Sequence, residues 1–254
     1  MNQNFLIFVS TILFSANVFA QSLSIYCEDD TPLQFVGVDG KLTGFSIEIV
    51  REIQKRVGNT DEIHMVPWAR GVSILNTEAN SLLFSMARTA ERDAQYQWIG
   101  PITETVYGFY VKANSTLKIT SLEDAKQVGL IGVYRDDARD QFLTRQGFTN
   151  LDRANSNVSS FKKLMLGRIV MYADSPMGVK SLAENSGYKL SDVRVAYNFL
   201  KIQLYIAASK KTDQAIVTKW NAALESMKKE AVFTRIHKKY FPDLALPGPA
   251  ITKY

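Results

Sequence analysis

Two arginines that could bind an anion, Arg88 and Arg92, lie four residues apart in the segment SMARTAERDAQYQWIGP at 85–101. The segment follows an apolar run that predicts a buried strand. Thr89 can cap a short helix over residues 90–96, because its hydroxyl can accept from a backbone N–H one turn on. Guanidinium groups and free helix N–H groups at the end of a strand can hold a carboxylate. These residues leave the alternative, a surface arginine pair in salt bridges, equally open.

The N-terminal segment predicts export from the cytoplasm. An apolar stretch at 5–18 ends in small residues near Ala20, which is the pattern of a signal peptide. The stretch is shorter than the ~20 residues that cross a bilayer. We therefore expect residues 1–20 to be a signal peptide cleaved after Ala20, and the mature chain from Gln21 to be periplasmic. The single cysteine, Cys27, excludes an internal disulfide and is expected to be a buried, inert thiol.

The composition is that of a globular protein large enough for two lobes. The 254 residues are 46% hydrophobic and 22% charged, with a formal net charge of +5. Many of the basic residues occur in scattered pairs: Lys162-Lys163, Lys210-Lys211, Lys228-Lys229 and Lys238-Lys239. Because these pairs form no run interleaved with aromatic residues, we do not expect nucleic-acid binding. We expect a mildly cationic monomer.

Strands and helices alternate in the first third of the chain. The clearest helix is marked by the apolar stripe Phe45, Ile49, Ile53 and Val57, and Gly58 is expected to end it. The other expected elements are a strand at 23–27, a strand at 63–66, a helix through 75 and a strand that ends at Ser85. This alternation predicts an α/β lobe with a mainly parallel sheet.

Three loops of this lobe directly follow strands, at 28–30, 67–70 and 85–92. In parallel sheets, ligands bind beyond the carboxyl ends of the strands, so these loops are expected to converge on one site. Their convergence favours the anion-site interpretation of the two arginines. Of the pair, we expect Arg92 to bind the anion and Arg88 to be the partner of a neighbouring acid.

The other polar and aromatic side chains of these loops have open roles. Trp68 could stack on a ligand or pack in the core. Arg70 could reach the cleft from the first turn of its helix or point into solvent. The acidic loop that begins at Glu28 could attract a cationic group of a ligand or be solvated.

A second α/β pattern follows an extended aromatic segment at 107–111. Its expected elements are a strand at 128–133, a helix capped by Asp136 and running to about 145, a helix capped by Ser159 or Ser160 and running to 166, a strand at 168–172, a loop at 173–175, a helix at 177–186 and a strand at 193–195. An alternating segment at 200–207 is expected to cross back to the first lobe. Two amphipathic helices then close the chain.

Six segments in this order resemble the extracellular solute-binding proteins of family 3, the amino-acid receptors of ABC importers. They are PLQFVGVDGKLTGFSIEIVREI, VPWARG, FSMARTAERDAQYQWIGPI, VGLIGVYRDDARDQFL, LGRIVMYAD and ALESMKKEAVFTRIHKKYF. The resemblance implies the type II periplasmic-binding-protein fold, with two α/β lobes, two crossing hinge strands and a ligand held between the lobes. Lobe one would comprise residues 21–107 and 204–254, and lobe two residues 108–203.

The resemblance also implies roles for individual residues. Arg92 would hold the α-carboxylate of a ligand, assisted by Ser85 and Ala87. Trp68 would be an aromatic platform. In lobe two, Tyr134 matches a backbone donor at a helix start, and Asp174 matches the acid that receives an α-ammonium group. The implied partners are a small carboxylate ligand and an ABC permease or a membrane receptor.

An enzyme on the same fold, a dehydratase or lyase of a small carboxylic acid, is the main rival interpretation. Its general acid would be a cleft carboxylate with a raised pKa, for which Glu28 and Asp174 are the candidates. The two histidines, His64 and His237, lie far apart in the sequence, and we expect no metal, no cofactor and no catalytic residues. A third interpretation is a sensory binding protein that presents its ligand to a membrane receptor.

Overall fold

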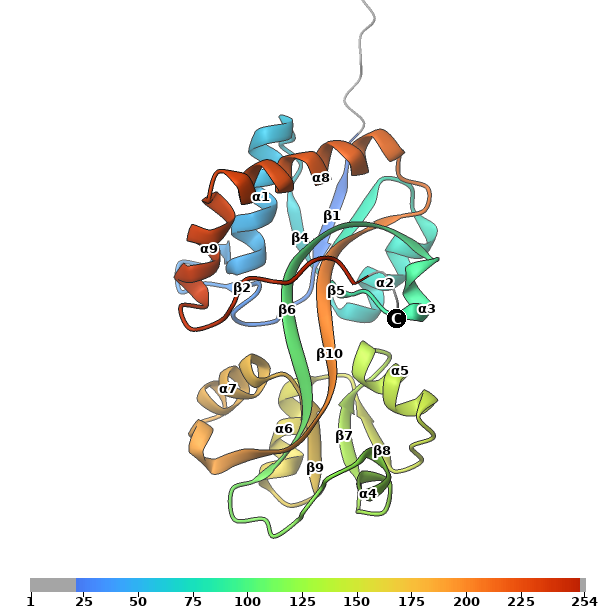
Figure 1. The fold of residues 1–254 in the computed structure, drawn as a ribbon, viewed down its shortest axis with the longest axis vertical. Helices are drawn as coiled ribbons and strands as arrows, with labels where there is room; N and C mark the ends of the chain where they lie inside the picture. Colours follow the sequence, from blue (N-terminus) through green and yellow to red (C-terminus); the bar gives the residue numbers. More distant parts are fainter. Residues whose placement is uncertain (1–21, 252–254) are drawn as a thin grey trace, which may run out of the picture.

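The computed structural model describes residues 22–251, which fold into two lobes joined by two long strands (Figure 1). These strands, β6 (Tyr96–Lys112) and β10 (Val193–Ser209), run side by side from one lobe to the other. The predicted signal peptide at 1–20 lies outside the described residues. Within the described part of the chain, no helix is long and apolar enough to cross a membrane.

Eight strands form one sheet that continues through both lobes, in the order β4-β1-β5-β10-β6-β9-β7-β8. In lobe one β1 pairs in parallel with β4 and β5, and in lobe two β7 pairs in parallel with β8 and β9. The two connecting strands pair antiparallel with each other, and each also joins one lobe, β10 to β5 and β6 to β9. The remaining strands are β1 (Ser24–Cys27), β4 (Ile63–Met65), β5 (Ser81–Ala87), β7 (Ile131–Tyr134), β8 (Leu151–Ala154), β9 (Met171–Asp174) and the hairpin of β2 (Phe35–Val36) and β3 (Leu42–Thr43).

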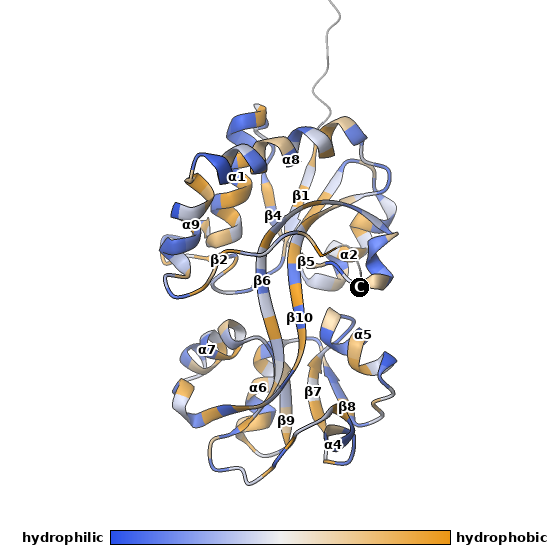
Figure 2. Ribbon diagram, viewed as in Figure 1, coloured by the Kyte–Doolittle hydropathy of each residue, from blue (hydrophilic) through white to orange (hydrophobic). Residues whose placement is uncertain are grey.

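Helix α1 (Phe45–Val57) confirms the expected apolar stripe of lobe one. Phe45, Ile49 and Ile53 are fully buried, and the helix ends at Gly58, whose φ of 72° is in the left-handed region that glycine adopts at low cost. The helix packs with the two C-terminal helices, α8 (Gln214–Lys229) and α9 (Val232–Tyr240), around one core. Figure 2 shows polar and apolar residues interleaved along these helices, as expected where one face packs and the other meets water.

The helices of lobe two begin at different residues from those expected. Asp137, and not Asp136, caps α5 (Ala138–Arg145), because its carboxylate accepts from two backbone N–H groups of the first turn. Ser156 caps α6 (Asn157–Met165), so the caps predicted at Ser159 and Ser160 are wrong. The other helices of this lobe are α4 (Leu122–Lys126), α7 (Pro176–Asn185) and a single 3₁₀ turn at Leu190–Asp192.

The connecting strands are longer than the sequence pattern indicated. Helix α3 (Ala90–Asp93) stops early, and Tyr96 already belongs to β6, where it pairs with Ser209 of β10. The predicted helix to residue 96 is therefore too long, because the ladder with β10 satisfies the backbone groups of this segment. The predicted loop at 173–175 is also shorter, since β9 extends to Asp174.

Candidate functional site

A small cavity lies between the lobes, with walls formed by strand ends and by loops that follow the strands of both. This inner cavity has a volume of about 60 Å³. Lobe one contributes the ends of β1 and β5 and the start of α2 (Trp68–Thr77), and lobe two contributes the start of α5 and the end of β9. Six of the predicted contact residues line it: Glu28, Trp68, Ser85, Ala87, Arg92 and Asp174.

Arg92 is a buried guanidinium that lacks a carboxylate partner. The residue is 5% exposed, and its guanidinium donates to two backbone carbonyls, Ala87 O and Asp136 O, both at 3.3 Å. No carboxylate of residues 22–251 forms an ion pair with it. Burial lowers the pKa of Arg92, because the charged form loses hydration. A carboxylate in the inner cavity would supply the missing counter-charge.

Ser85 occupies a bulge in β5. Its neighbours Phe84 and Met86 pair with consecutive residues of β10, so Ser85 is the extra residue, and its φ of 61° is in the left-handed region. Its hydroxyl donates to Gln34 Oε1 at 2.7 Å and lies 2.9 Å from Ser46 Oγ. These bonds hold the bulge in place. Ser85 and Ala87 both line the inner cavity, and the Ala87 carbonyl accepts from Arg92.

Trp68 packs against Arg92. The side chain is 5% exposed, belongs to a core cluster with Leu83 and Met86, and its ring centroid lies 5.3 Å from the Arg92 guanidinium carbon. The core alternative for this residue is confirmed, and its face meets the Arg92 cation at the cavity wall. Stacking on a ligand stays a prediction. Its indole N–H, buried, has no hydrogen-bond partner in the described chain.

Arg88 and Arg70 lie away from the inner cavity. Arg88 forms an ion pair with Asp93 at 2.6 Å and stacks on Trp98 and Tyr205, which confirms its expected pairing with a neighbouring acid. Arg70 is exposed on the first turn of α2 and lines none of the cavities between the lobes.

The carboxylate of Asp174 forms its hydrogen bonds and its ion pair with residues of lobe two. Its carboxylate accepts from the Tyr172 hydroxyl at 2.6 Å, from the Ser175 backbone N–H at 2.7 Å and from Arg139, with which it forms an ion pair. Three of its roughly four acceptor positions are therefore occupied. Burial raises the pKa of Asp174, and Arg139 partly opposes this.

Arg139 is the site residue that sequence reasoning missed. It is 6% exposed, forms ion pairs with Asp137 and Asp174, and stands 5.4 Å from the Tyr107 ring. Burial opposes its charge, but the two acids outweigh that effect and raise its pKa well above the usual value. The segment Asp-Asp-Ala-Arg-Asp directly after a predicted strand was the available signal, because such a dense set of charges at a helix start can turn inward to pair.

Glu28 and Asp30 extend from the end of β1 into the gap between the lobes. Burial raises the pKa of Asp30 to about 7, with Asp174 as the next cause, while Arg139 opposes it. Burial also raises the pKa of Glu28 well above its usual value, with Asp30 and Asp137 adding to the effect. Neither carboxylate forms an ion pair with a basic side chain of the described chain.

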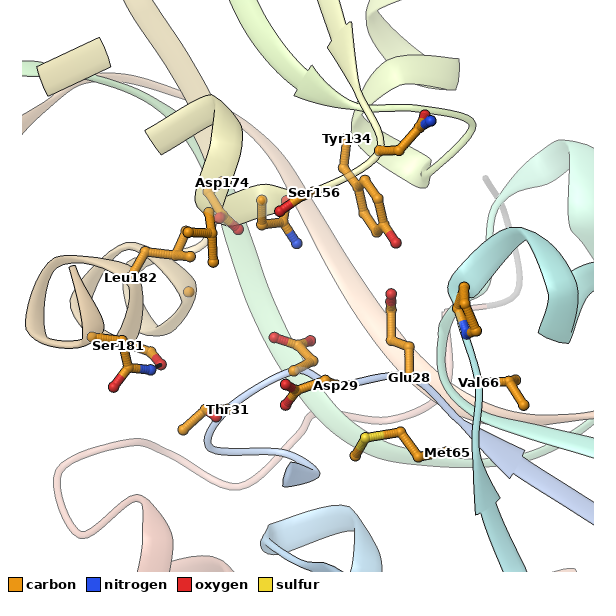
Figure 3. Close-up of a pocket in the computed structure, with 17 residues that line it drawn as sticks. Glu28, Asp29, Thr31, Met65, Val66, Tyr134, Ser156, Asp174, Ser181 and Leu182 are labelled. Atoms are coloured by element: carbon orange, nitrogen blue, oxygen red, sulfur yellow. Dashed lines mark hydrogen bonds between the residues drawn. The ribbon is translucent and has the colours of Figure 1, made fainter. Parts of the chain in front are cut away.

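A second cavity adjoins the first and is shown in Figure 3. This outer cavity has a volume of about 430 Å³ and shares the side chains of Glu28, Asp30, Asn157 and Asp174 with the inner one. Figure 3 shows the side chains of Glu28 and Tyr134 directed toward each other from opposite lobes. Burial and the neighbouring Glu28 carboxylate raise the pKa of the Tyr134 hydroxyl. Among the described residues, no group of His, Cys, Asp and Glu is arranged to hold a metal ion.

Residues 23–243 match the bacterial extracellular solute-binding proteins, family 3. The chain belongs to this family. It is 22% identical to the L-cystine-binding protein TcyA of Bacillus subtilis, over 79% of this chain and 73% of that protein. It is also 22% identical to the arginine-binding periplasmic protein of Mannheimia haemolytica, over 91% and 96% of the two chains.

Solved structures show the same fold at low identity. A histidine kinase sensor domain with similarity to periplasmic binding proteins aligns with a TM-score of 0.79 at 19% identity, covering 89% of this chain and 99% of that one. An ancestral arginine-binding protein bound to arginine aligns with a TM-score of 0.76 at 23% identity, covering 87% and 98%. The family-3 chain therefore has the two-lobed fold of periplasmic binding proteins that its sequence predicts.

Proposed function

We propose that this family-3 protein is a periplasmic receptor that captures a small carboxylate ligand, with an amino acid favoured, between its two lobes for ABC-type import. The observation that carries the proposal is Arg92. A buried arginine without a counter-ion, here 5% exposed, is costly, and a ligand carboxylate would offset that cost by charge-assisted hydrogen bonds. Ser85 and Ala87 would complete the carboxylate subsite from the bulged end of β5.

The two lobes already contact each other around the proposed ligand site, and these contacts would support closure. Arg92 of lobe one donates to Asp136 O of lobe two, and Tyr134 of lobe two meets Glu28 of lobe one. A ligand that touches both sides of this gap favours the closed form by its differential affinity for that form. The bodies that move would be residues 21–107 with 204–254, and residues 108–203.

The test is a binding screen with the mature protein. Thermal-shift and titration-calorimetry measurements over the amino acids and small organic acids should identify at least one carboxylate ligand. The Arg92→Ala variant should lose binding by 100-fold or more, or about 3 kcal/mol. The proposal fails if no carboxylate compound binds, or if Arg92→Ala binds the ligand as tightly as the wild type.

An enzyme remains the second candidate because Glu28 has the chemistry of a general acid. Its carboxyl lies in the cleft, and burial raises its pKa well above the usual value, which is the direction that a general acid needs. Turnover of prephenate or arogenate by the wild type, lost in Glu28→Gln, would favour the dehydratase interpretation. Binding without turnover would favour the receptor.

A further inference from the structure

We infer that the C-terminal tail, residues 242–251, is a strap that locks the lobe-one end of the hinge and limits how far the two lobes can open. The hinge is formed by the connecting strands β6 and β10, and the tail crosses both of them at the dark red end of the chain in Figure 1. The segment that matches the family ends at residue 243, so nearly all of the tail lies beyond it. The strap would act with or without a ligand and therefore goes beyond the proposed function.

A single buried side chain holds the tail. Gln203 of β10 is 0% exposed, and its Nε2 donates to the carbonyl of Pro249 at 2.9 Å and lies 3.2 Å from the carbonyl of Gly248. Its Oε1 accepts from the backbone N–H of Ile251 at 3.0 Å. Both polar atoms of the amide are thus bonded to the tail. Without the tail these buried groups would lose hydrogen-bond partners, which is costly.

Gln203 lies where β10 leaves lobe one. The next residues of β10, beginning with Leu204, pair with β5, whereas Gln203 itself is aligned with Glu104 of β6. Leu204 and Thr105 line the inner cavity, and successive side chains of a strand point to opposite faces. Gln203 and Glu104 therefore face away from the inner cavity, and the tail lies behind the hinge. It can act on the hinge without touching a ligand.

The tail is bonded beside one of three weak points in the hinge. The pairing of β6 with β10 changes register at 195–197, 198–200 and 204–206, and a strand bends most easily where its ladder is interrupted. At the last of these places β10 also changes register against β5, so its backbone pairing is irregular on both sides. The Tyr205 hydroxyl, in the middle of this interruption, donates at 3.0 Å to the same Gln203 oxygen that accepts from the tail. The tail thus stiffens the 204–206 interruption and leaves bending to the two interruptions nearer lobe two.

The sequence of the tail suits a strap that is attached at few points. Pro247 and Pro249 fix φ at about −65°, so the segment loses less conformational entropy when it is ordered. Leu244 and Leu246 are 48% and 44% exposed, so the first part of the tail buries little apolar surface. The attachment is therefore concentrated at residues 248–251, and a change at Gln203 should release the strap.

The test measures the opening of the ligand-free mature protein by pulsed EPR. Nitroxide labels at Ser73→Cys on α2 and Gln146→Cys at the end of α5 occupy exposed positions on opposite lobes. The native Cys27 does not compete for the label, because it is fully buried and burial raises its pKa to about 12. A protein that ends at Asp243 should show a broader distance distribution, which extends to longer distances than that of the full chain.

Point variants separate a strap from general support of the fold. Gln203→Leu keeps the tail but removes the amide that binds it, so it should broaden the distance distribution in the same way. It should also speed amide hydrogen exchange at 204–206 by about 10-fold or more, because this part of the hinge would open locally. Leu244→Ala, at an exposed residue of the same tail, should change neither measurement.

Urea denaturation of each variant completes the comparison. If the shortened protein and Gln203→Leu are less stable but keep the distance distribution of the full chain, the tail only supports the fold and the strap is overturned. A distribution shifted to shorter distances also overturns it, because the tail would then favour opening. If the shortened protein does not fold, Gln203→Leu alone decides between these outcomes. None of the measurements uses a ligand, so failure of the strap is independent of failure of the proposed function.

Discussion

Two buried arginines face the same small cavity and have opposite surroundings. Arg92 of lobe one is 5% exposed and bonds to backbone carbonyls and an indole face. Arg139 of lobe two is 6% exposed and forms ion pairs with Asp137 and Asp174. Burial lowers the pKa of Arg92, whereas the two acids raise the pKa of Arg139.

The difference separates a charge that is part of the scaffold from one that is available to a ligand. A buried guanidinium with its own carboxylates is satisfied, and removing it strands two negative charges. A buried guanidinium without carboxylate partners has an uncompensated positive charge, which an anionic ligand can neutralise. An arginine at the same burial can therefore stabilise one lobe or bind a ligand in the other. The carboxylates around it decide which role it has.

The largest expected effect is on stability, from the same substitution at the two arginines. Arg139→Met should lower the free energy of unfolding by about 3–5 kcal/mol, because Asp137 and Asp174 would stay buried without a counter-charge. Arg92→Met should lower it by less than about 1 kcal/mol, since no carboxylate is stranded. Urea denaturation of the ligand-free proteins measures both. Equal losses at the two positions would contradict the distinction between them.

The next largest expected effect is the pH dependence of the free energy of unfolding that Asp30 causes. The pKa of Asp30 is about 7 in the folded chain and near its ordinary value of 3.8 when unfolded, so folding favours the protonated form. The stability that this group contributes is present below about pH 4 and is lost as the pH rises through 7. The expected loss is on the order of 2–4 kcal/mol, from about 1.4 kcal/mol per pKa unit.

Asp30→Asn is the matched control for this titration, because asparagine resembles the protonated acid and does not ionise. Denaturation of the wild type and of the variant at several pH values between 4 and 8 isolates the contribution of Asp30. The free-energy difference between the two proteins should move in favour of the variant as the pH rises. A difference that stays constant over this range would show that Asp30 has an ordinary pKa.

A smaller effect is expected from the ring that supports Arg92. Trp68→Leu keeps an apolar side chain but removes the π face, which contributes about 0.5–2 kcal/mol to the position of a buried cation. Ligand affinity should therefore fall by roughly 2- to 30-fold. Calorimetry with the ligand found in the screen provides the measurement, and an unchanged affinity would mean that Arg92 is positioned by its backbone contacts alone.

The smallest expected effect concerns the ion pair between Arg145 and Glu91, which joins the lobes at the edge of the cleft with a distance of 2.8 Å. Both side chains are more than a third exposed, at 40% and 34%, so solvent screens the pair. Arg145→Ala should change ligand affinity by less than about 1 kcal/mol. A loss larger than that of Trp68→Leu would show that closure depends on this edge contact.

Much of the fold could be predicted from the sequence because local patterns specified it. The stripe that begins at Phe45 and the glycine at 58 fixed α1 within its observed bounds, and the strand–helix order predicted the parallel pairing in each lobe. The errors occurred where distant segments compete for backbone hydrogen bonds. Residues 94–96 have a helical pattern, yet pairing with β10 makes Tyr96 the first residue of a strand.

For the site, the sequence placed Glu28, Trp68 and Arg92 in loops that follow strands, and the family resemblance implied roles for Ser85 and Ala87 near the end of β5. Only the tertiary structure decided which charges are neutralised. Asp174 looked available in the sequence, but Arg139 reaches it across 35 positions of the chain. Electrostatic free energy depends on distance and burial in space, and neither can be obtained from spacing along a chain.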